Sequence, residues 1–211
     1  MFALVSRDRI ELPPGSFLKL PGTWQDYITL SEQRGDGSIP RMKYRDGEIL
    51  LMSPLPVHGY GANLLGDIVK TILDHLEQEY NAYTPVTMTL PEAYGIEPDI
   101  CFYIDNWQFS TGRDRIDWQV EPPFDLVIEM DVTSYSKVDD YLPFKVPEVW
   151  MYKKKQLRIY GFENDAYVIR ERSRFFPDIS ILDIVAECEQ IASERSTGAA
   201  IRSLRQKLNQ E

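Results

Sequence analysis

The chain has 211 residues, of which 23 are Lys or Arg and 33 are Asp or Glu, so its net charge is −10 at neutral pH. The length suits one domain over residues 1–211. No apolar run approaches the roughly 18 residues of a membrane span, and the first residues, MFALVSRDRIELPPG, do not have the pattern of a secretion signal, so we expect a cytoplasmic protein. The negative charge argues against a protein that binds nucleic acid over its whole surface, since phosphate contacts require clustered Lys and Arg.

The first part of the chain is predicted to contain two helices and a hairpin. Residues 1–22 are rich in proline and turn formers, and we expect them to wrap the surface. A short helix is predicted over residues 24–34, with Thr23 as its N-cap. Two strands flank Asp46-Gly47, a dipeptide that favours a type I′ turn. Helical spacing of apolar residues predicts a long helix over residues 58–80.

Most of the remaining chain is predicted to form strands. These segments are rich in β-branched and aromatic residues and cover residues 83–90, 97–105, 123–133, 147–152, 156–162 and 166–172. A polar loop is expected over residues 106–123, and a short helix within residues 134–146. From residue 181 onward the apolar residues return to helical spacing, which predicts a helical C-terminal tail.

Carboxylates interrupt two of the predicted strands. Glu97 and Asp99 stand at the start of one strand, and Glu129 and Asp131 lie between apolar residues of another. Side chains two residues apart on a strand point to the same face, so each pair shares a face. A buried carboxylate without a partner is costly, and a bound divalent cation is one partner that removes this cost. The two pairs therefore indicate a metal site if their strands are neighbours.

An acidic chain that approaches a polyanion needs local groups of basic residues. The candidates are Arg41, Lys43 and Arg45; Arg113 and Arg115; Lys137; and Lys153, Lys154 and Lys155. The last triplet stands between two predicted strands. We favour a surface hairpin turn there over a phosphate clamp.

Four segments, in this order, resemble the Uma-two family of restriction-endonuclease-like proteins in the PD-(D/E)xK nuclease superfamily. They are RMKYRDGEILLMSPLPVHG, GIEPDICFYI, RIDWQVEPPFDLVIEMDVTS and VPEVWMYKKKQLRIY. The resemblance implies an α/β (α+β) fold with the restriction-endonuclease-like αβββαβ core, in which helices flank a mixed central sheet. It places this core in residues 24–162, between an N-terminal arm and a C-terminal helical tail.

The resemblance also assigns the residues of the superfamily motif. Asp99 matches its aspartate and Glu129 its glutamate, whereas the lysine of the motif falls at Asp131. Lys43 is a second departure, because it stands where the family commonly has an acidic residue. The motif lysine is credited with orienting or activating the hydrolytic water, so its replacement bears directly on catalysis.

A divalent cation is the cofactor that the resemblance implies, namely Mg²⁺ with Mn²⁺ as an alternative. Asp99 and Glu129 are its expected ligands. Asp131 is expected either as a third ligand or as the holder of a water on the metal. Glu97 lies on the same face as Asp99 and is either an outer ligand or a surface charge.

Three other side chains have two interpretations each. Lys137 is either the replacement for the motif lysine or an ordinary solvated side chain, and Lys43 has the same two interpretations. His58, which resembles a family position, is either a phosphate donor or proton shuttle, or a polar residue at a helix start. The expected catalytic set is Asp99, Glu129, Asp131 and Lys137.

Together these residues predict a Mg²⁺-dependent endonuclease that hydrolyses DNA phosphodiester bonds. Its expected partner is DNA, and the resemblance to nucleases of this fold predicts a homodimer. The alternative is a catalytically inactive member of the fold that acts as a binding or regulatory module. The replaced lysine and the negative charge favour the alternative, whereas three clustered carboxylates favour the nuclease, since an inactive site gains nothing from them.

Overall fold

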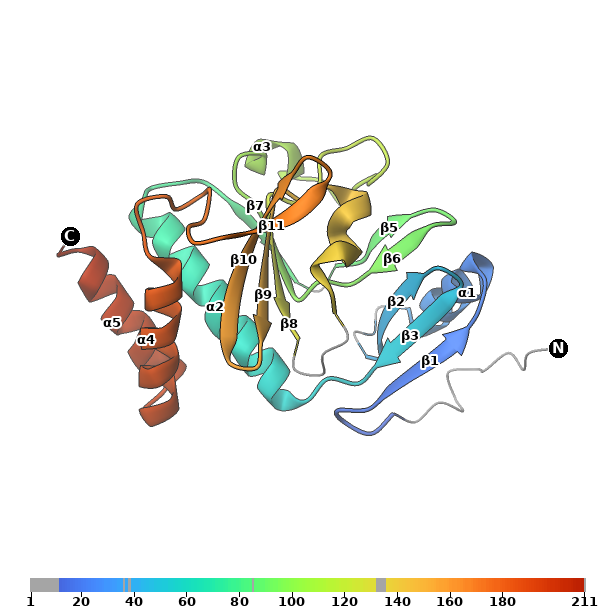
Figure 1. The fold of residues 1–211 in the computed structure, drawn as a ribbon, viewed down its shortest axis with the longest axis horizontal. Coiled ribbons are helices and arrows are strands. Elements are labelled where there is room, and N and C mark those ends of the chain that lie inside the picture. The colour runs from blue at the N-terminus through green and yellow to red at the C-terminus, as the bar shows by residue number, and fades with distance from the viewer. Residues whose placement is uncertain (1–11, 36, 38, 85, 132–135, 211) are drawn as a thin grey trace.

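The protein was obtained as a computed structural model, which describes residues 12–35, 37, 39–84, 86–131 and 136–210. Two β-sheets follow one another along the long axis of the molecule, and helices lie at its C-terminal end (Figure 1). The five-stranded sheet has the order β1-β3-β2-β6-β5, and the six-stranded sheet has the order β11-β10-β9-β8-β7-β4.

The five-stranded sheet is antiparallel and comes from the N-terminal half of the chain. Its strands are β1 (Phe17–Pro21), β2 (Arg41–Arg45), β3 (Glu48–Met52), β5 (Met88–Leu90) and β6 (Tyr94–Ile96). The β2–β3 hairpin turns at Asp46 and Gly47, which both have positive φ as a type I′ turn requires. This hairpin confirms the prediction.

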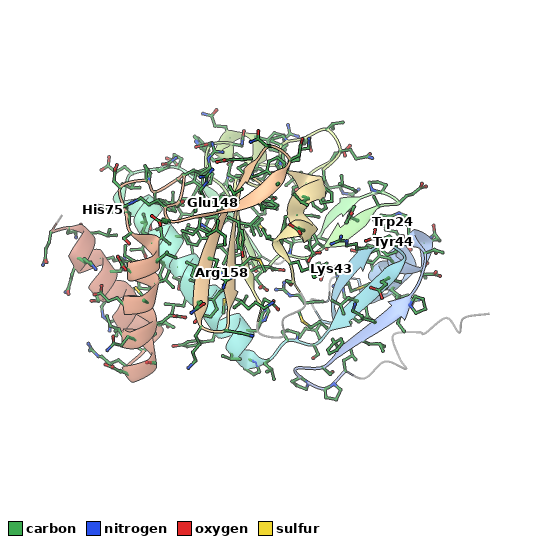
Figure 2. All side chains as sticks on the ribbon, in the orientation of Figure 1. Trp24, Lys43, Tyr44, His75, Glu148 and Arg158 are labelled. Carbon is green, nitrogen blue, oxygen red and sulfur yellow. The ribbon has the colours of Figure 1, made fainter. Side chains whose placement is uncertain are left out.

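Helix α1 (Trp24–Arg34) packs against this sheet through aromatic rings. It begins as predicted at Thr23, whose hydroxyl accepts a hydrogen bond from the backbone N–H of Asp26. The ring centroids of Trp24 and Tyr44 lie 5.4 Å apart, and both residues are labelled in Figure 2. The Tyr27 and Tyr44 centroids lie 5.7 Å apart, so three rings join the helix to the strand within the range of favourable aromatic contacts.

The six-stranded sheet is mixed, because β8 and β9 are parallel and its other neighbouring strands are antiparallel. Its strands are β4 (Asn81–Tyr83), β7 (Ile100–Tyr103), β8 (Leu126–Met130), β9 (Glu148–Lys153), β10 (Gln156–Glu163) and β11 (Ala166–Arg170). All five residues of β8 are buried, as expected for a strand covered on both faces. The mixed sheet with its helices confirms the predicted fold class.

Helices cover one face of the larger sheet. The apolar residues of α2 (Pro56–His75) share a core with Leu126 and Ile128 of β8. Helices α4 (Ile181–Glu194) and α5 (Thr197–Leu208) pack together beside α2 (Figure 1). Helix α3 (Trp107–Ser110) and the 3₁₀ helix η2 (Val138–Phe144) lie in connections. In the described ranges, no helix is long and apolar enough to cross a membrane.

The structure corrects several predicted boundaries. The single strand expected over residues 83–90 is two strands, β4 and β5, which belong to different sheets. β-Branched residues favour a strand in whichever sheet it pairs, so the sequence pattern hides this crossing. Strand β6 lies between two predicted strands, in residues to which no strand was assigned, and β1 lies in the segment expected to wrap the surface.

Other predictions hold with shifted ends. Helix α2 begins at Pro56 and ends at His75, before Glu77, which has positive φ. The loop expected over residues 106–123 contains α3, and the short helix expected within residues 134–146 is η2. Residues 1–11 and 132–135, which carry parts of three predicted segments, lie outside the described residues.

A buried ion pair joins α1 to the segment that leads into β7. The guanidinium of Arg34 donates two hydrogen bonds to the carboxylate of Glu97, at 2.8 and 2.5 Å. The backbone N–H of Met42 and the hydroxyl of Thr87 donate to the same carboxylate, at 2.9 and 3.2 Å. The two charged side chains are 9% and 6% exposed, so the pair lies inside the protein. Glu97 therefore fixes the chain two residues before Asp99.

Arg34→Ala is expected to lower the free energy of unfolding by about 3 kcal/mol or more, because it leaves the Glu97 carboxylate buried without its cation. Urea denaturation of the variant and the wild type measures the difference. Arg170→Ala is the matched control, since it breaks an exposed pair with Glu163 and should cost about 1 kcal/mol or less. Equal stability of Arg34→Ala and Arg170→Ala would contradict a structural role for the buried pair.

Candidate functional site

Asp99 is fixed at the entrance to β7 by contacts with three other segments. Its side chain is 2% exposed. The backbone N–H of Met130 on β8 donates to its Oδ2 at 2.7 Å, and the hydroxyl of Thr84 donates to its backbone carbonyl at 2.7 Å. These bonds orient the carboxylate toward the end of β8, as the prediction of neighbouring strands requires.

The antiparallel register of β7 and β8 brings Asp99 close to Glu129. Ile100, the first residue of β7, pairs with Ile128, so Asp99 lies just before the paired residues on one side and Glu129 just after them on the other. The contact of the Asp99 carboxylate with the Met130 N–H agrees with this placement. Burial, together with the negative charge of Asp99, raises the pKa of Glu129 from 4.5 to about 8. Two carboxylates thus share a buried space that favours only one negative charge.

Basic and polar groups surround this pair. Nη1 of Arg41 lies 2.9 Å from Oδ1 of Asp99, and Nε2 of His58 on α2 lies 2.8 Å from the same oxygen. Arg41 also donates to the backbone carbonyl of Glu97 at 2.9 Å. The charges of Arg41 and Lys43 and a hydrogen bond with Ser136 oppose the rise in the pKa of Glu129. The structure thus brings His58 to Asp99, whereas the sequence left His58 with two interpretations and offered Arg41 only as one of many cations.

Other buried carboxylates in the same sheet are satisfied by the protein itself. Asp125 accepts three hydrogen bonds, two from Asn106 and one from the backbone N–H of Ile104. Glu148, labelled in Figure 2, accepts three, from the indole of Trp150, the hydroxyl of Ser173 and the backbone N–H of Arg174. Both carboxylates therefore hold loops in place. Glu129 differs because burial and the negative charge of Asp99 both oppose its ionisation.

Asp131 contacts the neighbouring strand β9. Its backbone N–H donates to the carbonyl of Tyr152 at 2.9 Å, and its Oδ2 lies 2.7 Å from Nζ of Lys153. The Asp131 side chain is 1% exposed and the Lys153 side chain 38% exposed. A buried carboxylate thus meets a lysine that reaches the surface. The sequence predicted a hairpin turn at Lys153, Lys154 and Lys155. The turn forms at Lys154 and Lys155, which have positive φ, whereas Lys153 is the last residue of β9 and pairs with Gln156.

Lys43 and Lys137 belong to a second group of charges beside the carboxylate pair. The ammonium of Lys43, labelled in Figure 2, pairs with Asp140 of η2, and Nη1 of Arg45 lies 3.0 Å from the same carboxylate. The backbone N–H of Lys137 donates to Asp140 at 2.8 Å. These residues line a cavity of about 360 Å³, and the Lys137 side chain is exposed there.

A separate cavity of about 490 Å³ reaches Asp99 from the side of α2. Arg41, His58 and Asp99 contribute its charged and polar groups, and Ile39 and Leu55 are among its apolar residues. The cavity therefore reaches the Asp99 side of the carboxylate pair, and Glu129 is not among its lining residues.

The residues that the structure describes contain no group of three or more His, Cys, Asp and Glu side chains arranged to hold a metal ion. Asp99 and Glu129 still fit Mg²⁺, which proteins commonly bind through one or two carboxylates while it keeps several waters. A divalent cation between them would neutralise the repulsion that raises the pKa of Glu129. The predicted third ligand, Asp131, instead has Lys153 as its charged partner.

A family model and a solved structure are similar to the chain. The family model Uma2, described as "Putative restriction endonuclease", matches residues 24–192. A crystal structure described as a putative nuclease belonging to DUF820, from Anabaena variabilis, aligns with a TM-score of 0.50 at 18% sequence identity. The alignment covers 89% of this chain and 99% of that chain, and at this identity it shows the fold alone. A comparison with curated proteins gives no match.

Glu129→Gln is expected to change how stability depends on pH in EDTA. The folded chain binds the Glu129 proton more tightly than the unfolded chain, with a pKa of about 8 against 4.5. The free energy of unfolding of the wild type therefore falls as pH rises through this window. Gln does not titrate, so the free energy of unfolding of the variant should not fall in this way. Relative to the wild type it should rise by roughly a few kcal/mol between pH 5 and pH 8.

Urea denaturation at four pH values from 5 to 8 measures this difference. Glu171→Gln is the matched control, since Glu171 is exposed, and it should follow the wild type. A constant difference between Glu129→Gln and the wild type across this range would contradict the electrostatic account of the carboxylate pair.

Proposed function

The chain belongs to the Uma2 family of restriction-endonuclease-like proteins, and from this membership and its carboxylate pair we propose that it is a Mg²⁺-dependent DNA endonuclease. The observation that carries the proposal is the closeness of Asp99 and Glu129 across β7 and β8. We assign both carboxylates as ligands of Mg²⁺, with Mn²⁺ as a substitute. The bound ion would polarise the phosphate and lower the pKa of the attacking water.

The chain's own side chains orient the groups of this site. In the proposal, His58 holds Asp99 through its Oδ1, and the Met130 N–H fixes the other oxygen. Arg41 is assigned to the phosphate, since a guanidinium beside Asp99 can donate to a phosphate oxygen that approaches the same carboxylate. Glu97 is assigned no ligand role, because Arg34 already occupies its carboxylate. Lys43 is assigned to holding η2 through Asp140.

The negative net charge of the chain argues against DNA binding over its whole surface, but basic groups lie near the site. Lys43, Arg45 and Lys137 line one cavity. Arg41 lies against Asp99 and Lys153 against Asp131, although the whole chain has a net charge of −10. A local group of cations is sufficient to contact a few phosphates. DNA therefore fits as the substrate of this face.

One observation favours a second function, that of a binding or regulatory module without catalysis. Asp131 stands where the motif has its lysine. If no other lysine serves the reaction, the same surface would bind DNA and leave it intact. One measurement separates the two functions. A protein that has been shown to bind the metal should cleave DNA if it is a nuclease and leave DNA intact if it is a binding module.

Asp99→Ala and Glu129→Ala are each expected to weaken Mn²⁺ binding by at least tenfold in isothermal titration calorimetry, because each removes one of two charged ligands. Each should also lower Mg²⁺-dependent nicking of supercoiled plasmid by about 100-fold or more. The exposed Glu171→Ala is the control and should retain both properties. Metal binding without nicking by the wild type would favour the binding module. A wild type that shows neither metal binding nor nicking would contradict the proposed nuclease.

Two predictions stay untested: the homodimer, which rests on the resemblance, and the cytoplasmic location, which rests on the composition. We expect the purified protein to elute as a homodimer in gel filtration with light scattering, at twice the chain mass of 24.5 kDa. A monomer at high micromolar concentration would contradict the predicted homodimer and leave the carboxylate site unaffected.

A further inference from the structure

The parallel pairing of β8 and β9 brings Lys153 beside the motif position that has lost its lysine. Glu129 pairs with Met151, and Met130 pairs with Tyr152. The Asp131 N–H continues this ladder to the carbonyl of Tyr152 at 2.9 Å. Asp131 and Lys153 are therefore neighbours across the two strands, and their Oδ2 and Nζ atoms lie 2.7 Å apart.

Lys153 also lies on the face of the sheet that carries Glu129. Side chains alternate along a strand, so the face that holds Glu129 on β8 holds Met151 and Lys153 on β9. The core confirms this alternation, because Val127, Val149 and Met151 all belong to one cluster. The Lys153 ammonium thus stands at the open end of the strand pair, one step beyond the carboxylate site.

Two other lysines near the site have different surroundings. The ammonium of Lys43 is engaged by Asp140 on η2. Lys137 precedes η2, and its exposed side chain lines the cavity beside Asp140. Lys153 differs from both because a buried carboxylate at the motif position fixes its ammonium, while 38% of its side chain stays exposed and can meet a substrate.

We propose that Lys153 supplies from β9 the ammonium that the motif ordinarily supplies from the position of Asp131, and that Asp131 is its positioning residue. This role rests on the proposed nuclease function. Lys153 belongs to β9, the strand next to β8, and lies at the same end of the site as Asp131. Its positive charge is therefore close to the place of the motif lysine, although its position in the sequence differs. Asp131 is retained because without it the ammonium would move freely in solvent.

The reaction served by this group is hydrolysis. The oxygen of a water forms a bond to phosphorus while the bond from phosphorus to one sugar oxygen breaks. That sugar oxygen takes a proton and leaves as a hydroxyl, and the second hydrogen of the water departs to solvent from the new phosphate. The Lys153 ammonium donates a hydrogen bond to the attacking oxygen or to a phosphate oxygen as negative charge develops there.

Lys153→Met tests the role directly. The turnover number for plasmid nicking should fall by about 100-fold or more, a size typical for loss of such a group. Mn²⁺ affinity in calorimetry should stay within threefold of the wild type, because Lys153 is no ligand. Lys154→Met is the matched control, since it removes the same charge from the adjacent exposed turn, and its nicking should stay within twofold.

Three further variants separate a chemical role from a structural one. Lys153→Arg keeps the charge and should retain more activity than Lys153→Met. Asp131→Lys in the Lys153→Met background returns the lysine to the motif position, and should raise nicking at least tenfold above Lys153→Met alone. Asp131→Asn combined with Lys153→Met leaves no buried unpaired carboxylate, so it should fold even if Lys153→Met does not, and it should be inactive.

The outcomes distinguish the role of Lys153 from the nuclease function itself. Nicking by Lys153→Met, or by the folded Asp131→Asn/Lys153→Met protein, at the wild-type rate would overturn the role of Lys153 and leave the nuclease standing. Loss of activity in Lys137→Met, with Lys153→Met still active, would overturn that role equally. A wild type that neither binds Mn²⁺ nor nicks DNA would overturn the proposed nuclease and the role of Lys153 together.

Discussion

The site depends on one constraint, the antiparallel pairing of β7 and β8 that brings Asp99, at the entrance to β7, close to Glu129 on β8. Burial, and after it the negative charge of Asp99, raises the pKa of Glu129. Much of the surrounding structure holds the two carboxylates together. The Arg34 and Glu97 pair fixes the chain before Asp99, and α2 brings His58 to its Oδ1. The five-stranded sheet contributes Arg41 to the same oxygen.

The five-stranded sheet explains how an acidic protein can present cations at this site. Strand β2 supplies Arg41 and Lys43 to the end of the larger sheet, where they offset the charge of Glu129. Strand β9 supplies Lys153 from the other side. Each of these cations has a carboxylate partner, so the site is organised as a network of charges in which a metal ion or a phosphate would exchange partners with groups already present.

The sequence predicted the larger elements because their signals are local. The N-cap Thr23, the Asp46-Gly47 turn and the apolar stripe of α2 each lie within one segment. The meeting of Asp99 and Glu129 was expected only if their strands were neighbours, and the resemblance, not alternation along a strand, paired these two residues. The sequence could not predict the partition of residues 83–90 between two sheets, because strand propensity does not identify the partner strand. Lys153 was assigned to a turn for the same reason: only the parallel register of β8 and β9 shows that it meets Asp131. Asp125 and Glu148 show the converse, since both are buried carboxylates that the fold satisfies without any metal.

The proposed chemistry requires that Asp99 and Glu129 hold a divalent cation between them. The most direct measurement is the anomalous difference map of crystals grown with Mn²⁺, recorded near the manganese absorption edge. We predict one strong peak between the carboxylates of Asp99 and Glu129, with the guanidinium of Arg41 moved away from Asp99. A map without a peak there at millimolar Mn²⁺, or with its strongest peak at another group of side chains, would contradict the proposed metal site.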